Sequence, residues 1–240
     1  MPALRLDGRS PADIRPLHFT RSWLPQVPGS VLVDSGLTRV LCTAVVEDGV
    51  PKFLKQSDQG WVTAEYSMLP AATSNRRPRD RGPKVDGRSI EIQRLIGRAL
   101  RAVVDRRALK GRTVWVDCDV VSADGGTRTA SINGAYVALH DALADAVNRG
   151  TLKRNPLVDS LQAISVGVVD GEPMADLSYY EDSSAEVDMN LVMTGSGRMV
   201  EMGGGAEQGA FDFDMMQSLM ELGRQANARV ATLQKEALSG

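Results

Sequence analysis

The chain has 240 residues, of which 42% are hydrophobic, so it can bury the core of one large domain or two small ones. Its formal net charge of −2 gives no global electrostatic reason to expect binding to nucleic acid or to a membrane surface. No apolar stretch reaches the length of a membrane span, and the N-terminus lacks the apolar run of a signal peptide. We expect no membrane association, and the two widely separated cysteines favour a reduced, cytoplasmic setting.

The first half of the chain mixes strand and helix patterns. β-Branched residues predict a hairpin of residues 31–33 and 38–46, and a third strand is expected at 60–66. Apolar residues recur at helical spacing over 92–103, and strict alternation predicts a strand at 114–120. A second helix follows, with these apolar residues expected on one face: Ile132, Ala135, Tyr136, Leu139, Leu143 and Val147.

The second half is predicted to contain strands and a long C-terminal helix at about 214–238. Three glycines at 203–205 are expected to break the strand pattern. No low-complexity linker separates the two halves, so we expect one α+β domain spanning residues 1–240. The predicted strands cover residues 161–169, 173–180, 187–193 and 198–202.

Residues Asp124 to Thr129 are the most informative stretch, because they join the strand at 114–120 to the following helix. Gly125 and Gly126 allow close backbone approach, while Thr127 and Arg128 can donate hydrogen bonds at a helix N-terminus, where an anion is favoured. This arrangement predicts a phosphate pocket; the alternative is an ordinary turn capped by Thr127. The stretch matches neither the P-loop nor the dinucleotide fingerprint.

A basic stretch precedes the first predicted helix. Residues 71–86 contain hardly any apolar side chains, which predicts a loop. Its crowded positive charges would gain from an anionic partner such as an RNA backbone, although a solvated loop without a ligand also fits. Arg88 follows the loop and could reach an anion held nearby, or could be an ordinary surface arginine. The loop arginines are Arg76, Arg77, Arg79 and Arg81.

An acidic stretch near the middle of the second half supplies two carboxylates, Asp182 and Asp188. On a straight strand they would lie about 20 Å apart, so they can share a site only if Ser183 and Ser184 bend the chain back. Together they could then hold Mg²⁺, or one could act as a general acid. The alternative is a polar strand face preceded by a turn.

Taken together, these segments closely resemble bacterial ribonuclease PH over nearly the whole chain. The resemblance implies an α+β fold of mixed sheets packed with helices, shared with a ribosomal protein S5 domain. It also implies a phosphorolytic 3′-to-5′ exoribonuclease that trims tRNA precursors and other structured RNA 3′ ends, uses inorganic phosphate and releases nucleoside diphosphates. The matching segments are residues 7–9, 60–70, 91–101, 124–129, 181–183 and 188–190.

The resemblance also implies roles for individual residues. Asp182 and Asp188 would act in catalysis and in binding Mg²⁺, and the loop arginines Arg76, Arg77, Arg79 and Arg81 would contact tRNA. Members of the family form homohexameric rings, as trimers of dimers. The phosphate ligands would be Arg88, Gly126, Thr127 and Arg128.

Two departures from relatives are visible in the sequence. Ala71 stands where many relatives have an arginine, and residues 202–207 lack a Gln and a Thr that relatives often show. Rival hypotheses are a ring subunit that binds RNA without catalysis and an unrelated metabolic enzyme that binds phosphate or a nucleotide. The intact phosphate and acidic residues disfavour the first, and the basic loop disfavours the second.

Overall fold

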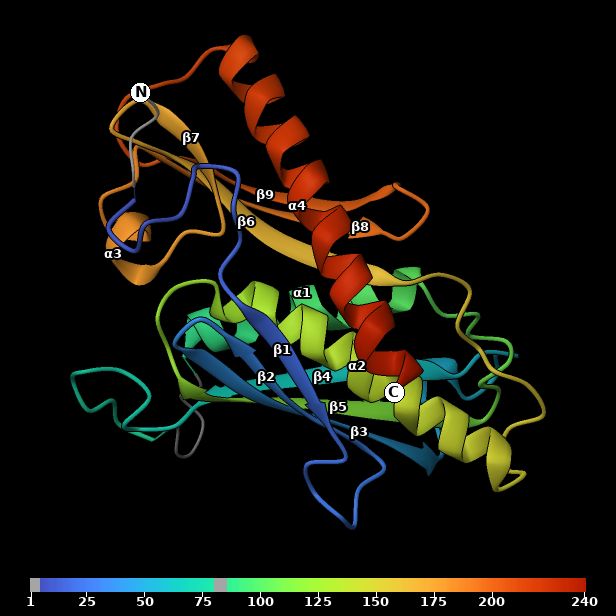
Figure 1. Ribbon diagram of the computed structural model, residues 1–240. Coiled ribbons are helices and arrows are strands. Elements are labelled where there is room, and N and C mark those ends of the chain that lie inside the picture. The colour runs from blue at the N-terminus through green and yellow to red at the C-terminus, as the bar shows by residue number, and fades with distance from the viewer. Residues whose placement is uncertain (1–4, 80–85) are drawn as a thin grey trace.

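The computed structural model describes residues 5–79 and 86–240, which form two β-sheets packed with helices (Figure 1). The first sheet has the strand order β1-β2-β3-β5-β4. It is mixed: β4 runs parallel to β5, with helix α1 as the crossover, and the other neighbours are antiparallel. The elements are β1 (Leu17–Arg21), β2 (Gly29–Ser35), β3 (Thr38–Asp48), a 3₁₀ turn (Lys52–Leu54), β4 (Trp61–Met68), α1 (Gly87–Ala102) and β5 (Arg112–Ser122).

The second sheet has the strand order β7-β6-β8-β9 and is antiparallel throughout. Helix α4 packs on β6 and β7 and reaches β1 of the first sheet, and Figure 1 shows it crossing both layers. The elements are β6 (Leu161–Val169), β7 (Glu172–Ala175), α3 (Tyr179–Asp182), β8 (Val187–Thr194), β9 (Met199–Ala206) and α4 (Phe213–Ser239).

Helix α2 (Thr127–Asn148) lies between the two sheets and packs on β2, β3 and β6 (Figure 1). It was predicted to have a single apolar face, but polar positions such as Ser131 and Asn133 are buried too. Asn133 satisfies its amide by exchanging hydrogen bonds with the backbone of Ala163 in β6, at 2.9 and 2.8 Å. One continuous apolar core therefore contacts α2 from both sides.

The prediction of a strand at residues 173–180 is wrong for the residues after Ala175. Strand β7 ends at Ala175, and the short helix α3 begins at Tyr179. Ser178 and Glu181 form a capping box, in which each side chain satisfies a backbone N–H of the other residue. The Ser-x-x-Glu spacing was the signal in the sequence, and the surrounding strand pattern obscured it.

The strand break predicted at the three glycines is also wrong, because β9 continues through them to Ala206. Gly204, with φ of +129°, pairs with Met189, and a Cβ built on it would lie 2.1 Å from the carbonyl oxygen of Asp188. Gly205 is the register partner of Asp188 itself. The glycines therefore allow β9 to pack closely against the strand that holds Asp188.

Most of the remaining elements overlap their predicted ranges, but strand β1 and the 3₁₀ turn were not predicted, and α1 begins at Gly87, five residues before the predicted period. Residues 71–79 form no helix or strand, as expected, and Arg81 lies outside the described residues. Over the described ranges, every helix is too short or too polar to cross a membrane. Cys42 and Cys118 are both buried free thiols that form no disulfide, and they are register partners on β3 and β5.

Candidate phosphate and carboxylate site

A cavity of about 540 Å³ opens where the start of α1, the start of α2 and the end of α3 meet. Apart from Arg128 and Asp188, which are not lining residues, the predicted phosphate and acidic residues line it together: Arg88, Gly126, Thr127 and Asp182. The first three belong to the first half of the chain and the last to the second half, so the two halves build the cavity jointly. The remaining lining residues are Met68, Thr73, Ser74, Asn75, Arg77, Ala123, Gly125 and Tyr179.

The N-terminus of α2 faces this cavity without a side-chain cap. Its cap residue is Gly126, in the left-handed conformation with φ of +64°, so the turn is not capped by Thr127. Gly125 also has a positive φ, of +74°. A 22-residue helix that begins in this way presents unpaired N–H groups and the positive end of its dipole to the cavity. Such a helix start is suited to hold an inorganic anion.

Thr127, the first residue of α2, is held in place by a buried tyrosine. The hydroxyl of Tyr66 donates a hydrogen bond of 2.9 Å to Oγ1 of Thr127. Burial raises the pKa of Tyr66, so this phenol remains protonated and acts as the donor at neutral pH. A hydroxyl that accepts a bond keeps its own hydrogen, so Thr127 can donate to an anion in the cavity.

Arginines from two helices and the preceding loop surround the same region. Arg88 is exposed at the start of α1, and Arg128, the second residue of α2, makes one long contact of 3.4 Å with Glu91. Arg77, predicted as a tRNA contact, lines the cavity, and its guanidinium donates a hydrogen bond of 3.1 Å to Asp86. The other described loop arginines, Arg76 and Arg79, are exposed and lie outside the cavity lining.

The acidic pair adopts the bent arrangement that a shared site requires. Helix α3 ends at Asp182, and a hydrogen bond of 3.0 Å from the Ser183 N–H to the Tyr179 carbonyl closes the turn before β8 begins. Burial, with the nearby charge of Asp182 as the second cause, raises the pKa of Asp188 to about 6. Burial also raises the pKa of Asp182, against the opposing effects of Arg88 and Arg128. The two carboxylates are close enough to repel each other.

The same pair fits a magnesium site with few protein ligands. Within the described ranges, no group of three or more His, Cys, Asp or Glu side chains is placed to hold a metal ion. Mg²⁺ usually keeps several waters and binds through one or two carboxylates together with substrate phosphates. A divalent cation beside Asp182 and Asp188 would favour the ionised carboxylates, and so would oppose both the burial and the repulsion that raise the pKa of Asp188.

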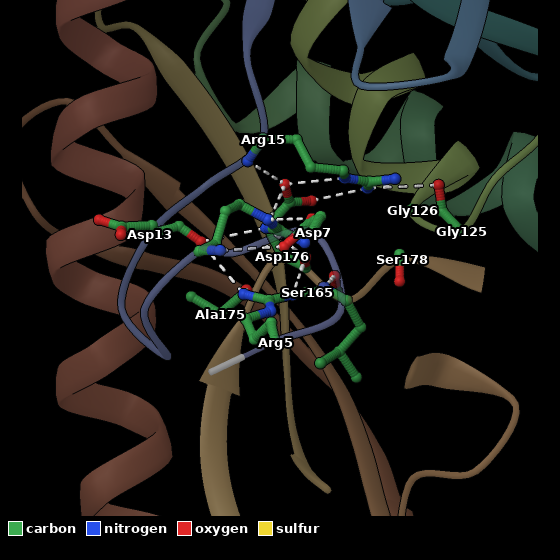
Figure 2. A network of polar contacts seen from close by, with 12 residues as sticks. Arg5, Asp7, Asp13, Arg15, Gly125, Gly126, Ser165, Ala175, Asp176 and Ser178 are labelled. Carbon is green, nitrogen blue, oxygen red and sulfur yellow. Dashed lines mark hydrogen bonds and ion pairs between the residues drawn. The ribbon is translucent and has the colours of Figure 1, made fainter. Parts of the chain in front are cut away.

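A buried ionic network, absent from the sequence analysis, supports the glycine turn (Figure 2). Arg15 makes a two-pronged contact with Asp176 at 2.7 and 2.9 Å and also donates to the carbonyl of Asp124. Burial alone would raise the pKa of Asp176, but the hydrogen bonds and charge of Arg15 outweigh it and lower the pKa. A Cβ on Gly126 would lie 2.9 Å from the Arg15 guanidinium. The network thus ties the turn to the second half of the chain.

A second buried arginine, Arg5, anchors helix α3 through Glu181. Arg5 donates two hydrogen bonds to Glu181, at 2.6 and 2.5 Å. It also donates to the carbonyls of Ala175 and Asp176 (Figure 2). Glu181 precedes Asp182, so this contact positions the carboxylate that lines the cavity. The N-terminal segment therefore packs against the second half of the chain, as Figure 1 also shows.

Comparison with known proteins agrees with this architecture. The model for domain 1 of the 3′ exoribonuclease family matches residues 13–144, and the model for domain 2 of the same family matches residues 160–226. Together these matches cover well over half of the chain. The chain therefore belongs to the 3′ exoribonuclease family and has the two-part α+β fold of ribonuclease PH-like proteins.

Solved structures with the same fold include subunits of exosomes. Rrp46 of rice (Oryza sativa) superposes with a TM-score of 0.80 at 22% identity, covering 98% of this chain and 100% of that chain. A chain of the Archaeoglobus fulgidus exosome, solved with RNA bound to the active site, gives 0.80 at 23%, covering 95% and 91%. An archaeal exosome core chain gives 0.78 at 22%, covering 96% and 91%. At these identities the likeness establishes the shared fold.

Proposed function

We propose that this protein is a phosphorolytic 3′-to-5′ exoribonuclease of the ribonuclease PH kind, which trims the 3′ ends of tRNA precursors and releases nucleoside diphosphates. One observation supports this most strongly: Arg88, the uncapped start of α2 and Asp182 line a single cavity. An anion seat beside a carboxylate suits an attack by phosphate on an RNA phosphodiester. Membership of the exoribonuclease family supplies the class of substrate.

In the proposed reaction, an oxygen of inorganic phosphate attacks the phosphorus of the last internucleotide bond. A P–O–P bond forms, the bond from phosphorus to the 3′ oxygen of the preceding nucleotide breaks, and that oxygen takes a proton. The products are a nucleoside diphosphate and an RNA one nucleotide shorter. Arg88, Arg128, Thr127 and the backbone N–H groups after Gly126 hold the attacking anion in line and stabilise the charge of the transition state.

Asp182 and Asp188 would hold Mg²⁺ next to the scissile phosphate. When bound, the ion neutralises charge on the phosphate oxygens. The alternative role of Asp188 is general acid toward the leaving 3′ oxygen, for which a pKa of about 6 is suited. The pH dependence of the rate separates these roles. A rate that rises through pH 6 requires the ionised carboxylate, and a rate that falls requires the protonated form.

The arginine loop would contact the RNA outside the cavity. Arg76 and Arg79 are exposed, and Arg77 lies at the cavity itself, so we assign Arg77 to the phosphates nearest the reaction and Arg76 and Arg79 to tRNA farther along. Arg81, outside the described residues, is proposed as a further tRNA contact. The Archaeoglobus fulgidus neighbour, solved with RNA at its active site, supports an RNA substrate for this fold.

We further propose a cytoplasmic homohexamer arranged as a trimer of dimers. The exosome cores among the structural neighbours support a multisubunit assembly. Light scattering coupled to size-exclusion chromatography should give a mass near six times 25.8 kDa. A stable monomer would contradict the ring. The alternative function is a ring subunit that binds RNA without catalysis, and the exosome chains among the solved structures with this fold are the observation that favours it.

The direct test is incubation of the purified protein with a tRNA that carries extra 3′ nucleotides, with Mg²⁺ and with or without phosphate. We expect nucleoside diphosphates only when phosphate is present. Release of monophosphates would indicate a hydrolytic enzyme, and RNA binding without any product would indicate the subunit without catalysis.

A further inference from the structure

An exposed aromatic side chain lies on the wall of the phosphate cavity. Tyr179 lines the cavity, yet 64% of the residue is accessible to solvent. Its neighbour Tyr180 is 67% exposed and is absent from the lining. Packing within residues 5–79 and 86–240 therefore does not explain why a large ring stands at this position of the wall.

The backbone of Tyr179 is fixed with respect to the anion seat. A Cβ built on Gly125 would lie 2.7 Å from the Tyr179 nitrogen, so α3 begins directly against the glycine turn. The capping box of Ser178 and Glu181, and the grip of Arg5 on Glu181, hold that helix start. Asp182 follows three residues later, which places it on the same face of the helical turn as Tyr179.

The size of the cavity leaves room for more than the attacking phosphate. An inorganic phosphate is only a few times larger than a water molecule, which takes about 30 Å³ in the liquid, whereas the cavity holds about 540 Å³. For attack, the reacting atoms must approach to about 3–3.5 Å. The terminal nucleoside of the RNA must therefore enter the same cavity, next to Tyr179.

We propose that the ring of Tyr179 is the stacking wall for the 3′-terminal nucleoside of the RNA. This inference rests on the proposed function and names a substrate contact within that site. Stacking on a phenol ring needs no hydrogen-bond pattern, because every base has a π face. An enzyme that removes successive nucleotides needs such a contact, since the base in the cavity changes at every step.

The test compares wild type, Tyr179→Ala, Tyr179→Phe and Tyr180→Ala in steady-state phosphorolysis of RNAs that end in A or in U. Tyr179→Ala should raise KM for RNA about 5- to 150-fold, the effect of removing one base–aromatic stack, for both 3′ ends. KM for phosphate should stay within about twofold of wild type, because the anion ligands are untouched. Tyr179→Phe should retain most of the RNA affinity, and Tyr180→Ala should match wild type.

The proposal is overturned if Tyr179→Ala behaves like Tyr180→Ala. It is also overturned if KM for phosphate rises in parallel, which would show that Tyr179 only holds the turn. A change of oligomeric mass on Tyr179→Ala would also overturn it, by showing that a second copy covers the ring. Binding of a short fluorescent RNA without phosphate separates this proposal from the proposed reaction. Wild type could make no diphosphate while Tyr179→Ala still binds the RNA more weakly than Tyr179→Phe and Tyr180→Ala. That result would contradict the proposed phosphorolysis and support the stacking contact.

Discussion

Asp188 is the site residue whose carboxyl pKa the fold raises most clearly, so its ionisation destabilises the folded protein relative to the unfolded chain. Burial and the charge of Asp182 raise its pKa from 3.8 to about 6. The folded protein therefore binds this proton more tightly than the unfolded chain. The stabilising effect of the carboxyl is complete below pH 3.8 and is lost as the pH rises through 6.

Replacing Asp188 with Asn should therefore stabilise the protein at high pH. A shift of this size corresponds to about 2–3 kcal/mol, and partial solvent access favours the lower value. We expect Asp188→Asn to raise the free energy of unfolding by about 2 kcal/mol at pH 8 without Mg²⁺, and by only about 0.5 kcal/mol at pH 4. Urea unfolding at the two pH values measures this.

Mg²⁺ provides the matching control for that prediction. The ion should raise the melting temperature of wild type at pH 8 and have little effect on Asp188→Asn, because the variant lacks one of the two carboxylates. A variant that is less stable than wild type at pH 8 would show that Asp188 forms contacts that outweigh the cost of its charge. The variant should also lose RNA trimming, since stability and activity conflict at such a position.

At the scale of elements, the turn before α2 brings the two halves of the site together. Gly125 combines a positive φ with close contact, because a Cβ there would lie 2.7 Å from the carbonyl oxygen of Leu177. Gly171, in the turn before β7, has a similar φ of +77° but has no atom within 4 Å of a built Cβ. Alanine substitutions at the two positions therefore distinguish the free-energy cost of backbone strain, present at both, from the cost of a steric clash, present only at Gly125.

We expect Gly171→Ala to cost about 1–2 kcal/mol, the penalty for a left-handed alanine. Gly125→Ala should cost about 1–3 kcal/mol more, because α3 must move away from the turn, and it should abolish RNA trimming. Urea unfolding and the trimming assay measure the two effects. Equal costs and equal activities for the two variants would mean that α3 does not depend on this turn.

The elements that could be predicted from the sequence are those with a long, regular period. Strand β5 alternates along its length, and α1 and α4 repeat apolar residues at helical spacing, so their limits were predicted within a few residues. Helix α3 has four residues, too few to show a period. Strand β9 continues through Gly203 to Gly205 because β8 packs against the glycines, and a neighbouring strand is not visible in a local pattern.

At the scale of the whole molecule, the two sheets share one apolar core and one buried ionic network. The turn before α2 and the acidic pair could be proposed as site candidates from residue types and spacing, and the resemblance to ribonuclease PH selected these roles over an ordinary turn and a polar strand face. The contacts of Arg15 with Asp176 and of Arg5 with Glu181 could not, because 161 and 176 positions separate the partners and no local pattern marks them. The network explains why residues from both halves meet at the cavity.

We predict that the two halves unfold in a single cooperative transition, as expected for one structural unit over residues 1–240. Asp176→Ala leaves the buried guanidinium of Arg15 without its partner, so it should lower the free energy of unfolding by about 3–5 kcal/mol. The control is Glu221→Ala, which removes an exposed ion pair with Arg224 and should leave the denaturation midpoint nearly unchanged. Two separate transitions in wild type would contradict the shared core.

The central claim is that inorganic phosphate, held at the start of α2 and by Arg88, is the nucleophile. Isotopically labelled phosphate tests it most directly, with a 3′-extended tRNA, Mg²⁺ and the wild-type protein. We expect the label in the β-phosphate of the released nucleoside diphosphates. Arg128→Ala should reduce the rate about 100- to 1000-fold, because the charge of Arg128 acts on Asp182 and Asp188 at the site. Arg94→Ala, at an exposed position in the middle of α1, should leave the rate unchanged. Unlabelled nucleoside monophosphates as the only products would show that water, and not phosphate, is the nucleophile.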